Sequence, residues 1–252
     1  MDVNSYLGVS GRTAIVTGGL GGIGSAIVKT FIDAGIRVVA VDIVETDLAE
    51  ERIPALGNGD HVYIQKNVGS VSNCEEIVAE TVRRTGRLDI LVNTAAILKR
   101  VPIDDVVEED WDLIMGANLK SQYFLSRAAS MPMRERHWGR VVNFTSQGAY
   151  TGGFHSSSVY NTAKGGILTL THSFARYLAP YGICVNGIAP GGVDTPMMAM
   201  PSEQLQEFVA QIPLGRMADP SEMASIVLFL ASEAARYITG TIIDASGGML
   251  MK

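Results

Sequence analysis

The sequence predicts an α/β fold with one doubly wound parallel sheet, about seven strands with helices on both faces. Short runs rich in β-branched residues alternate along the chain with segments whose apolar residues repeat at helical spacing. Each helical crossover between parallel strands returns right-handed across one face of the sheet, so both faces become covered. No linker, repeat or low-complexity tract divides the 252 residues, and we expect one domain, residues 1–252.

The expected strands are apolar runs, which we predict to be buried. They lie at 13–17, 38–42, 61–67, 90–93, 140–144, 183–188 and 241–244. Helical spacing is clear after the first run in Ile27, Val28 and Phe31. Residues 194–214 interrupt the alternation with several methionines and prolines, and we predict that this segment forms a lid over a substrate.

Composition excludes several classes of protein. The 26 acidic and 20 basic residues give a net charge of −6, which disfavours nucleic acid as a partner. Cys74 and Cys184 are far apart without a CxxC motif or clustered histidines, so we expect neither a disulfide framework nor a metal site. There is no apolar run of about 18 residues, which a membrane span requires, and no secretory pattern at the start. We therefore expect a cytoplasmic protein that does not enter a membrane.

A glycine-rich turn follows the first expected strand and opens a helix. Its backbone can approach a pyrophosphate closely because glycine has no Cβ, and the free N–H groups at the helix start favour a negative charge. We expect Gly18, Leu20, Gly22, Ile23 and Gly24 to contact a cofactor there.

Asp42 ends the second expected strand, 24 residues after Gly18. An acidic side chain at this place can accept hydrogen bonds from the adenosine ribose hydroxyls, with Ile43 beside it. A 2′-phosphate would meet the like charge of Asp42, and the turn holds no Arg or Lys to offset it. The sequence therefore favours NAD over NADP.

Three further side chains form a candidate catalytic group. Tyr160 and Lys164 are four residues apart at the start of an expected helix, hence on one face. Ser146 follows the strand 140–144, and its hydroxyl emerges at the carboxyl end of the sheet, where open α/β folds bind ligands.

Together these residues resemble the classical short-chain dehydrogenase/reductase family, whose fold is Rossmann-type, over nearly the whole chain. The matching positions, in order, are 17–24, Asp42, 93–96, Asn118, Ser146, Tyr160, Lys164, 190–195 and 237–240.

The resemblance implies an NAD-dependent oxidoreductase that interconverts an alcohol and its ketone or aldehyde. Tyr160 would be the general acid/base, and Lys164 would lower its pKa and bind the nicotinamide ribose. Ser146 would hold the substrate oxygen, and Asn118 would support a water that carries the proton away. Oxidation is the expected direction, since cytosolic NAD is expected to be mostly oxidised.

The resemblance also assigns further contacts. For the cofactor they are Asn67, Val68, Asn93, Ala95, Pro190, Gly191, Val193 and Thr195, besides Tyr160 and Lys164. For the substrate they are Gln147, His155 and Gly192, besides Ser146 and Tyr160. Asn67 stands where the family usually has Asp, and its carbonyl can accept the same hydrogen bond.

Several alternatives stay open. The substrate is either a polyol, sugar or hydroxy acid, or an apolar cyclic or aromatic alcohol under the methionines of the lid. A ketone or 3-oxoacyl reductase of the same family is the second activity, and a non-catalytic NAD-sensing protein is the rival from another class. The family resemblance implies a homotetramer.

Overall fold

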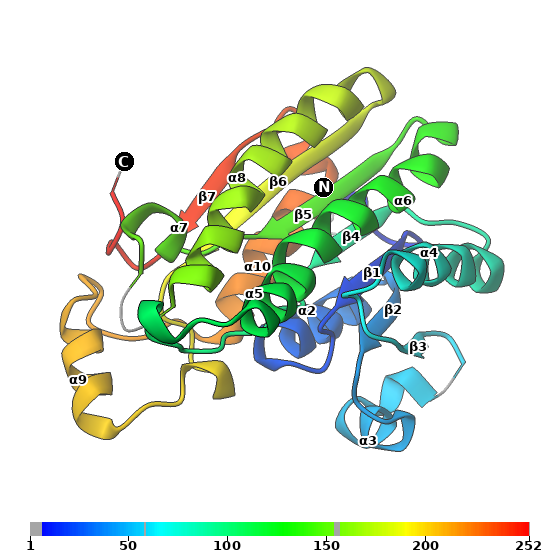
Figure 1. The fold of residues 1–252 in the computed structure, drawn as a ribbon. Coiled ribbons are helices and arrows are strands. Elements are labelled where there is room, and N and C mark those ends of the chain that lie inside the picture. Colours follow the sequence, from blue (N-terminus) through cyan, green and yellow to red (C-terminus); the bar gives the residue numbers. More distant parts are fainter. Residues whose placement is uncertain (1–6, 58, 154–156, 252) are drawn as a thin grey trace.

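The computed structural model describes residues 7–57, 59–153 and 157–251. In these residues seven parallel strands form one sheet in the order β3-β2-β1-β4-β5-β6-β7 (Figure 1). The strands are β1 (Thr13–Thr17), β2 (Arg37–Asp42), β3 (Val62–Gln65), β4 (Ile90–Asn93), β5 (Gly139–Phe144), β6 (Ile183–Pro190) and β7 (Ile242–Ala245). The predicted fold class is confirmed.

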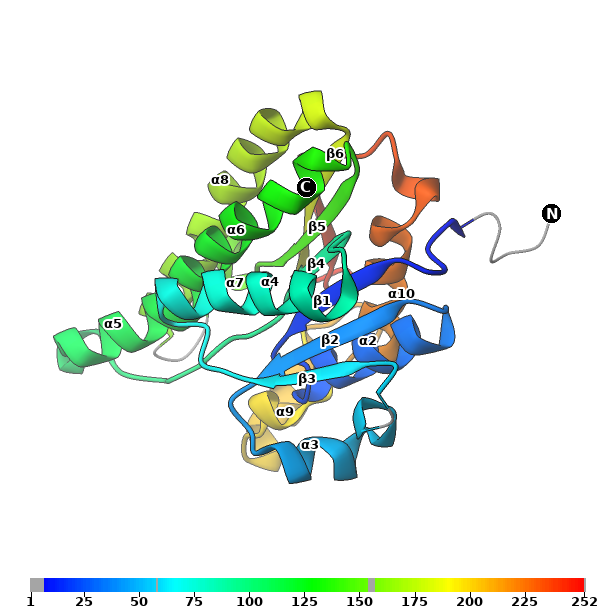
Figure 2. The same cartoon turned by 90° about the vertical axis from the view of Figure 1, so that its right-hand side faces the viewer.

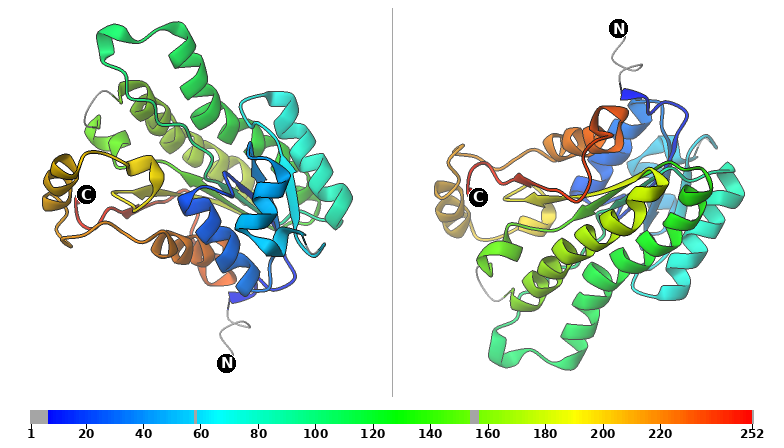
Figure 3. Two further views of the ribbon diagram at one scale, coloured as in Figure 1. Left: turned by 90° about the horizontal axis from the view of Figure 1, so that it is seen from below. Right: turned by 90° about the horizontal axis from the view of Figure 1, so that it is seen from above.

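Helices cover both faces of the sheet, which gives three layers (Figure 3). One face carries α2 (Gly22–Asp33) and α10 (Pro220–Ala231), and the other carries α4 (Val71–Thr85), α6 (Ser121–Glu135) and α8 (Ser158–Leu178). The shorter helices are α3 (Thr46–Arg52), α5 (Glu108–Met115), α7 (Gly148–Thr151) and α9 (Ser202–Ala210).

The inner strands are largely buried, because successive side chains enter the cores on opposite faces of the sheet. In β1, Ala14 and Val16 pack in the cluster beneath α2 and α10, whereas Ile15 packs in the cluster on the other face. The expectation that the strands are buried holds for these inner strands.

The two outer strands differ from that expectation. All four residues of β7 are half-buried, and in β3 only Ile64 is buried. Figure 2 shows β3 at one edge of the sheet, with α3 beside it. An edge strand has a neighbour on one side only, so solvent reaches more of its surface. The predicted strand 61–67 is correspondingly too long.

Local signals explain where some helices begin and end. Asp219 and Glu222 form a capping box at the start of α10, with Pro220 in its first turn. Ser70 accepts a hydrogen bond from the backbone of Asn73 at the start of α4, and Gly86 ends that helix with φ of 75°.

The predicted lid segment contains regular structure. It contains the 3-10 turn η5 (Pro196–Met198) and the helix α9, which lies beyond the carboxyl ends of the strands (Figure 1). Among the helices of the described residues, none is long and apolar enough to cross a membrane.

Candidate functional site

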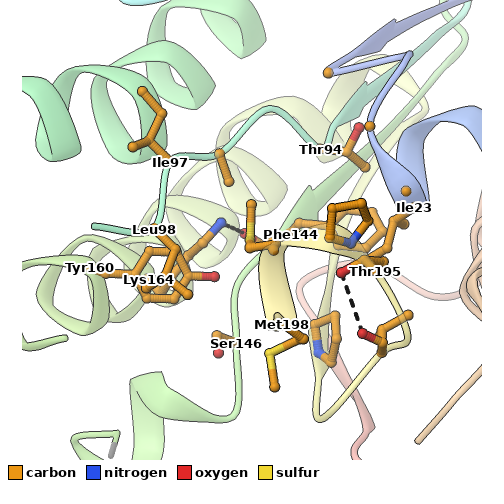
Figure 4. Close-up of a pocket in the computed structure, with 18 of the residues that line it drawn as sticks. Ile23, Thr94, Ile97, Leu98, Phe144, Ser146, Tyr160, Lys164, Thr195 and Met198 are labelled. Carbon is orange, nitrogen blue, oxygen red and sulfur yellow. Dashed lines mark hydrogen bonds between the residues drawn. The ribbon is translucent and has the colours of Figure 1, made fainter. Parts of the chain in front are cut away.

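A cavity of about 930 Å³ runs across the carboxyl ends of the inner strands. It extends from Asp42 at the end of β2 to Ser146 after β5 and on to Met198 and Phe208 of the lid segment. Figure 4 shows the part around Tyr160 and Lys164. This edge of an open α/β sheet is where such folds bind ligands, and the volume suits a cofactor together with a small substrate.

The turn after β1 has a backbone that only glycine fits. Gly18 has φ of 62°, and a Cβ on Gly24 would overlap the carbonyl oxygen of Gly18. A Cβ on Gly22 would lie 2.5 Å from the Thr195 side chain, so this turn and the loop after β6 are in contact. The residue at the start of α2, Gly21, has no side chain with which to cap the helix. Its free N–H groups and the bare glycines fit a pyrophosphate.

Asp42 is held at one end of the cavity by backbone hydrogen bonds. Its carboxylate accepts from the backbone N–H of Leu20 at 3.1 Å and from that of Ile43 at 2.8 Å. Each oxygen keeps a further lone pair for a ligand hydroxyl.

Two cationic side chains line the same end of the cavity as Asp42. They are Arg52 from α3 and Lys66 after β3, and Lys66 pairs with Glu76 at 2.6 Å. The turn itself holds no cation, as the sequence shows, but α3 brings Arg52 to the cavity from ten residues beyond Asp42. The cofactor end therefore carries both signs of charge.

Lys164 is buried, and its Nζ donates a hydrogen bond to the carbonyl oxygen of Phe144 at 2.7 Å (Figure 4). The same nitrogen lies 5.4 Å from the ring centre of Tyr160. Burial lowers the pKa of Lys164 to about 7, because the desolvated ammonium is costly.

Tyr160 is half-buried, and its ring lines the cavity. Burial raises the pKa of Tyr160, and the Ser146 hydroxyl acts in the opposite direction. From the sequence we expect Lys164 to lower this pKa. Burial is the largest cause of the shift at each group, and it raises the pKa of Tyr160 while it lowers that of Lys164.

Ser146 and Gln147 enter the cavity at the turn before α7. The Ser146 Oγ accepts a hydrogen bond from the backbone N–H of Gly148 at 3.1 Å. The Gln147 side chain is buried, and its Oε1 has no hydrogen-bond partner among the described residues. An unpaired buried amide at a cavity wall suits a polar ligand group.

Asn118 lies behind the cavity in a π-helical turn, η3 (Gly116–Lys120), between α5 and α6. Its Nδ2 donates to the carbonyl oxygens of Ile97 at 2.9 Å and Ile114 at 2.8 Å. Its Oδ1 is buried without a partner in the described part of the chain. That free acceptor fits a bound water.

Most of the predicted cofactor and substrate residues line the one cavity. They are Gly18, Leu20, Gly22, Ile23, Gly24, Asp42, Ile43, Asn67, Val68, Ala95, Ser146, Gln147, Tyr160, Lys164, Pro190, Gly191, Val193 and Thr195.

Three predicted residues are placed elsewhere, and a fourth is not described. Asn93 is buried inside the sheet, where its Nδ2 donates to the Asn143 side chain of the neighbouring strand β5 at 2.9 Å. Gly192 is buried against Phe208 of α9, and Asn118 lies behind the wall as described above. His155 lies outside the described residues.

Sequence reasoning missed several residues of the substrate half. Ile97 and Leu98 follow β4 and line the same cavity as Tyr160 (Figure 4). One face of α9 and the residue just after it contribute Gln204, Glu207, Phe208 and Gln211. Their spacing of three and four residues is the signal that identifies that face.

This fold and this arrangement of side chains define an oxidoreductase built on a parallel α/β sheet. A family model described as enoyl-(acyl carrier protein) reductase matches residues 18–250. The chain belongs to the short-chain dehydrogenase/reductase family.

Curated relatives and a solved structure match the chain over nearly its whole length. It is 37% identical over 247 residues to a 3-oxoacyl-(acyl-carrier-protein) reductase of Vibrio cholerae, covering 97% of this chain and 100% of the relative. It is 33% identical to an acetoacetyl-CoA reductase of an Acinetobacter strain, with 95% and 98% covered. A crystal structure of a candidate short-chain alcohol dehydrogenase from Sinorhizobium meliloti superposes with a TM-score of 0.89 at 36% identity, covering 95% and 96%.

Proposed function

We propose that the protein is an NAD-dependent oxidoreductase that interconverts an alcohol and its ketone or aldehyde, working in the oxidative direction. The observation that carries this is the single cavity in which Ser146, Tyr160 and Lys164 lie at one end and the glycine turn with Asp42 at the other. The cofactor, when bound, accepts the hydride and brings the positive charge of its oxidised ring.

Tyr160 is the general base for the alcohol proton. Its pKa, which burial raises, must fall for this role at neutral pH. Lys164 can assist because its Nζ is 5.4 Å from the Tyr160 ring centre, and its protonated form favours the phenolate. Lys164 also faces the cavity, where it can donate to the ribose hydroxyls of the nicotinamide half.

Ser146 positions the substrate oxygen by donating its hydroxyl hydrogen. Its Oγ already accepts from the backbone of Gly148, so its own hydrogen is directed elsewhere. Asn118 holds a water through its unpaired Oδ1, and this water leads the proton away from Lys164. Gln147 offers a polar contact to the substrate beneath the lid segment 194–214.

The choice of NAD rests on Asp42, whose carboxylate lies where a 2′-phosphate would meet a like charge. Arg52 at the same end acts against this preference, so we expect a measurable but incomplete selectivity for NAD over NADP.

A panel of polyols, sugars, hydroxy acids and cyclic or aromatic alcohols, screened for NADH formation, tests the proposal. The Tyr160→Phe variant should then lose nearly all turnover, by about 10² to 10⁴-fold, while NADH binding followed by nicotinamide fluorescence stays intact. Full activity of that variant contradicts the role of Tyr160.

Reduction of a ketone or a 3-oxoacyl thioester is the second candidate, and the two curated relatives described above favour it. Assays with 3-oxoacyl thioesters and NADH or NADPH distinguish it from alcohol oxidation. No turnover in either direction favours an NAD-sensing protein instead.

We also propose that the chain assembles as a homotetramer. Trp111, Leu113, Tyr123 and Met131 are exposed apolar residues on α5 and α6. A Cβ on Gly165 of α8 would meet nothing within 4 Å, so that face has room for a partner helix. Light scattering coupled to size-exclusion chromatography measures the mass directly, and a monomer contradicts the proposal.

A further inference from the structure

Asn161 follows Tyr160 directly and reaches backward from α8 to the end of α7. Its Nδ2 donates to the carbonyl oxygen of Gly152 at 2.8 Å and to the Ser157 Oγ at 2.9 Å. Asparagine is a weak helix former, but a short amide in the first turn can bond to groups before the helix. Asn161 is 8% exposed and lines the same cavity as Tyr160, so these two bonds are partly sheltered from water.

Two glycines make room for the Asn161 amide. A Cβ on Gly148 would overlap its Oδ1, and a Cβ on Gly153 would overlap its Nδ2. Gly153 has φ of 77°, which by itself favours glycine. Gly148 lies outside that left-handed region, so its lack of a side chain is explained by the space that Asn161 occupies.

The amide thereby joins two parts of the candidate catalytic group. Gly148 opens α7, and its N–H donates to the Ser146 Oγ at 3.1 Å. A shift of Gly148 moves the donor that orients Ser146, whereas Asn161 itself is fixed to the helix that carries Tyr160.

We propose that Asn161 is a positioning residue whose amide, seated between Gly148 and Gly153, sets the place of the Ser146 hydroxyl relative to Tyr160. This rests on the function proposed above. Asn161 lies between Tyr160 and Lys164 in the chain. It touches neither of the reacting groups and acts through the turn before α7.

The first test is Asn161→Ala, assayed with whichever alcohol or carbonyl compound the panel identifies. We expect kcat to fall about 10- to 100-fold, since small misplacements of reacting groups have effects of this size. The KM for NAD should change by less than about twofold, because Asp42 and the glycine turn are distant along the cavity. The pH profile of kcat should move to higher pH, because the Ser146 contact that lowers the pKa of Tyr160 is weakened.

Thr162→Ala is the matched control. Thr162 is the next residue, is exposed, and bonds only to the Ser158 carbonyl oxygen in the described structure, at 2.9 Å. It should leave kcat, KM and the pH profile as in the unmodified protein.

A double-mutant cycle tests the contact itself. Gly148→Ala should lower kcat about 10-fold or more in the presence of Asn161, yet change it by less than about twofold in the Asn161→Ala background, where its methyl enters vacated space. Equal effects in both backgrounds, or an unchanged kcat in Asn161→Ala, overturn the inference while the proposed function stands. Coupling seen in urea midpoints but not in kcat shows a merely structural contact and also overturns it. Absence of any turnover by the unmodified protein removes the proposed function and this inference together.

Discussion

The burial of Lys164 makes the free energy of unfolding depend on pH, which can be measured without a substrate. Its pKa is about 7 in the folded protein, well below the value of an unfolded chain. Between pH 7 and about 10 the unfolded chain therefore binds more protons, so the free energy of unfolding rises with pH, by at most about 1.4 kcal/mol per unit. Tyr160 adds little below about pH 9, because an unfolded tyrosine with a pKa of about 10 stays protonated there and the raised pKa keeps the folded one protonated.

We predict that Lys164→Met removes this rise. Urea unfolding at pH 7.0 to 9.5 without added cofactor gives the free energy of unfolding of the unmodified protein and of Lys164→Met. The difference between these two free energies at each pH measures the effect. Lys29→Met, at an exposed position of α2, serves as the control. Parallel curves for the unmodified protein and Lys164→Met contradict the prediction.

Asp42 and Arg52 oppose each other at the cofactor end of the cavity. We predict that Asp42→Ala raises the Kd for NADH about 10-fold and improves NADPH binding, since a carboxylate that accepts ribose hydroxyls and repels a phosphate is lost. Arg52→Ala should weaken the binding of NADPH and change the Kd for NADH by less than about twofold. Nicotinamide fluorescence titrations measure both. Equal binding of NADH and NADPH by the unmodified protein contradicts the proposal that Asp42 selects NAD.

At the scale of elements, the inner strands were predictable because burial on both faces leaves an uninterrupted apolar run, as in Ile90 to Val92 of β4. The edge strands were less predictable, since the half-buried β7 and the short β3 do not form an uninterrupted buried run. The glycine turn and the Tyr/Lys spacing were predictable because each is local along the chain. Arg52 and Asn161 were not, because their roles depend on contacts between separate elements.

The π-helical turn η3 holds Asn118 in a buried position. It turns Asn118 so that its Nδ2 donates to two carbonyl oxygens, while the Oδ1 has no partner among the described residues. We predict that Asn118→Leu lowers kcat about 10- to 100-fold with NADH binding intact, since the water site is lost. Ser121→Ala, also buried and bonded through Oγ to the Ala117 carbonyl oxygen, is the matched control and should affect stability alone. A similar loss of kcat in both variants shows that general disruption of the turn, rather than the water, is responsible.

Across the whole molecule, the two ends of the sheet are built for different purposes. The cavity lies at the carboxyl ends of the strands. At the amino ends Trp138, just before β5, stacks with two arginines, whose Cζ atoms lie 3.7 Å (Arg12) and 4.4 Å (Arg140) from its ring centre. Its Nε1 donates to Glu233 at 2.6 Å, and Glu233 lies 3.7 Å from Arg140. This stack joins β1 and β5 to the segment after α10.

We predict that Trp138→Ala lowers the free energy of unfolding by about 1–3 kcal/mol, because it removes stacking on two cations and leaves the buried Arg140 less well paired. Its kcat and KM should stay within about twofold, since the cavity lies at the other end of the strands. Tyr237→Ala is the control, an aromatic ring that is 100% exposed, and it should change stability by less than about 0.5 kcal/mol. Urea unfolding and steady-state kinetics of both variants measure the two effects separately. A loss of kcat in folded Trp138→Ala contradicts the separation, because it would mean that the amino-end stack sets the geometry at Tyr160 and Ser146 through the length of β5.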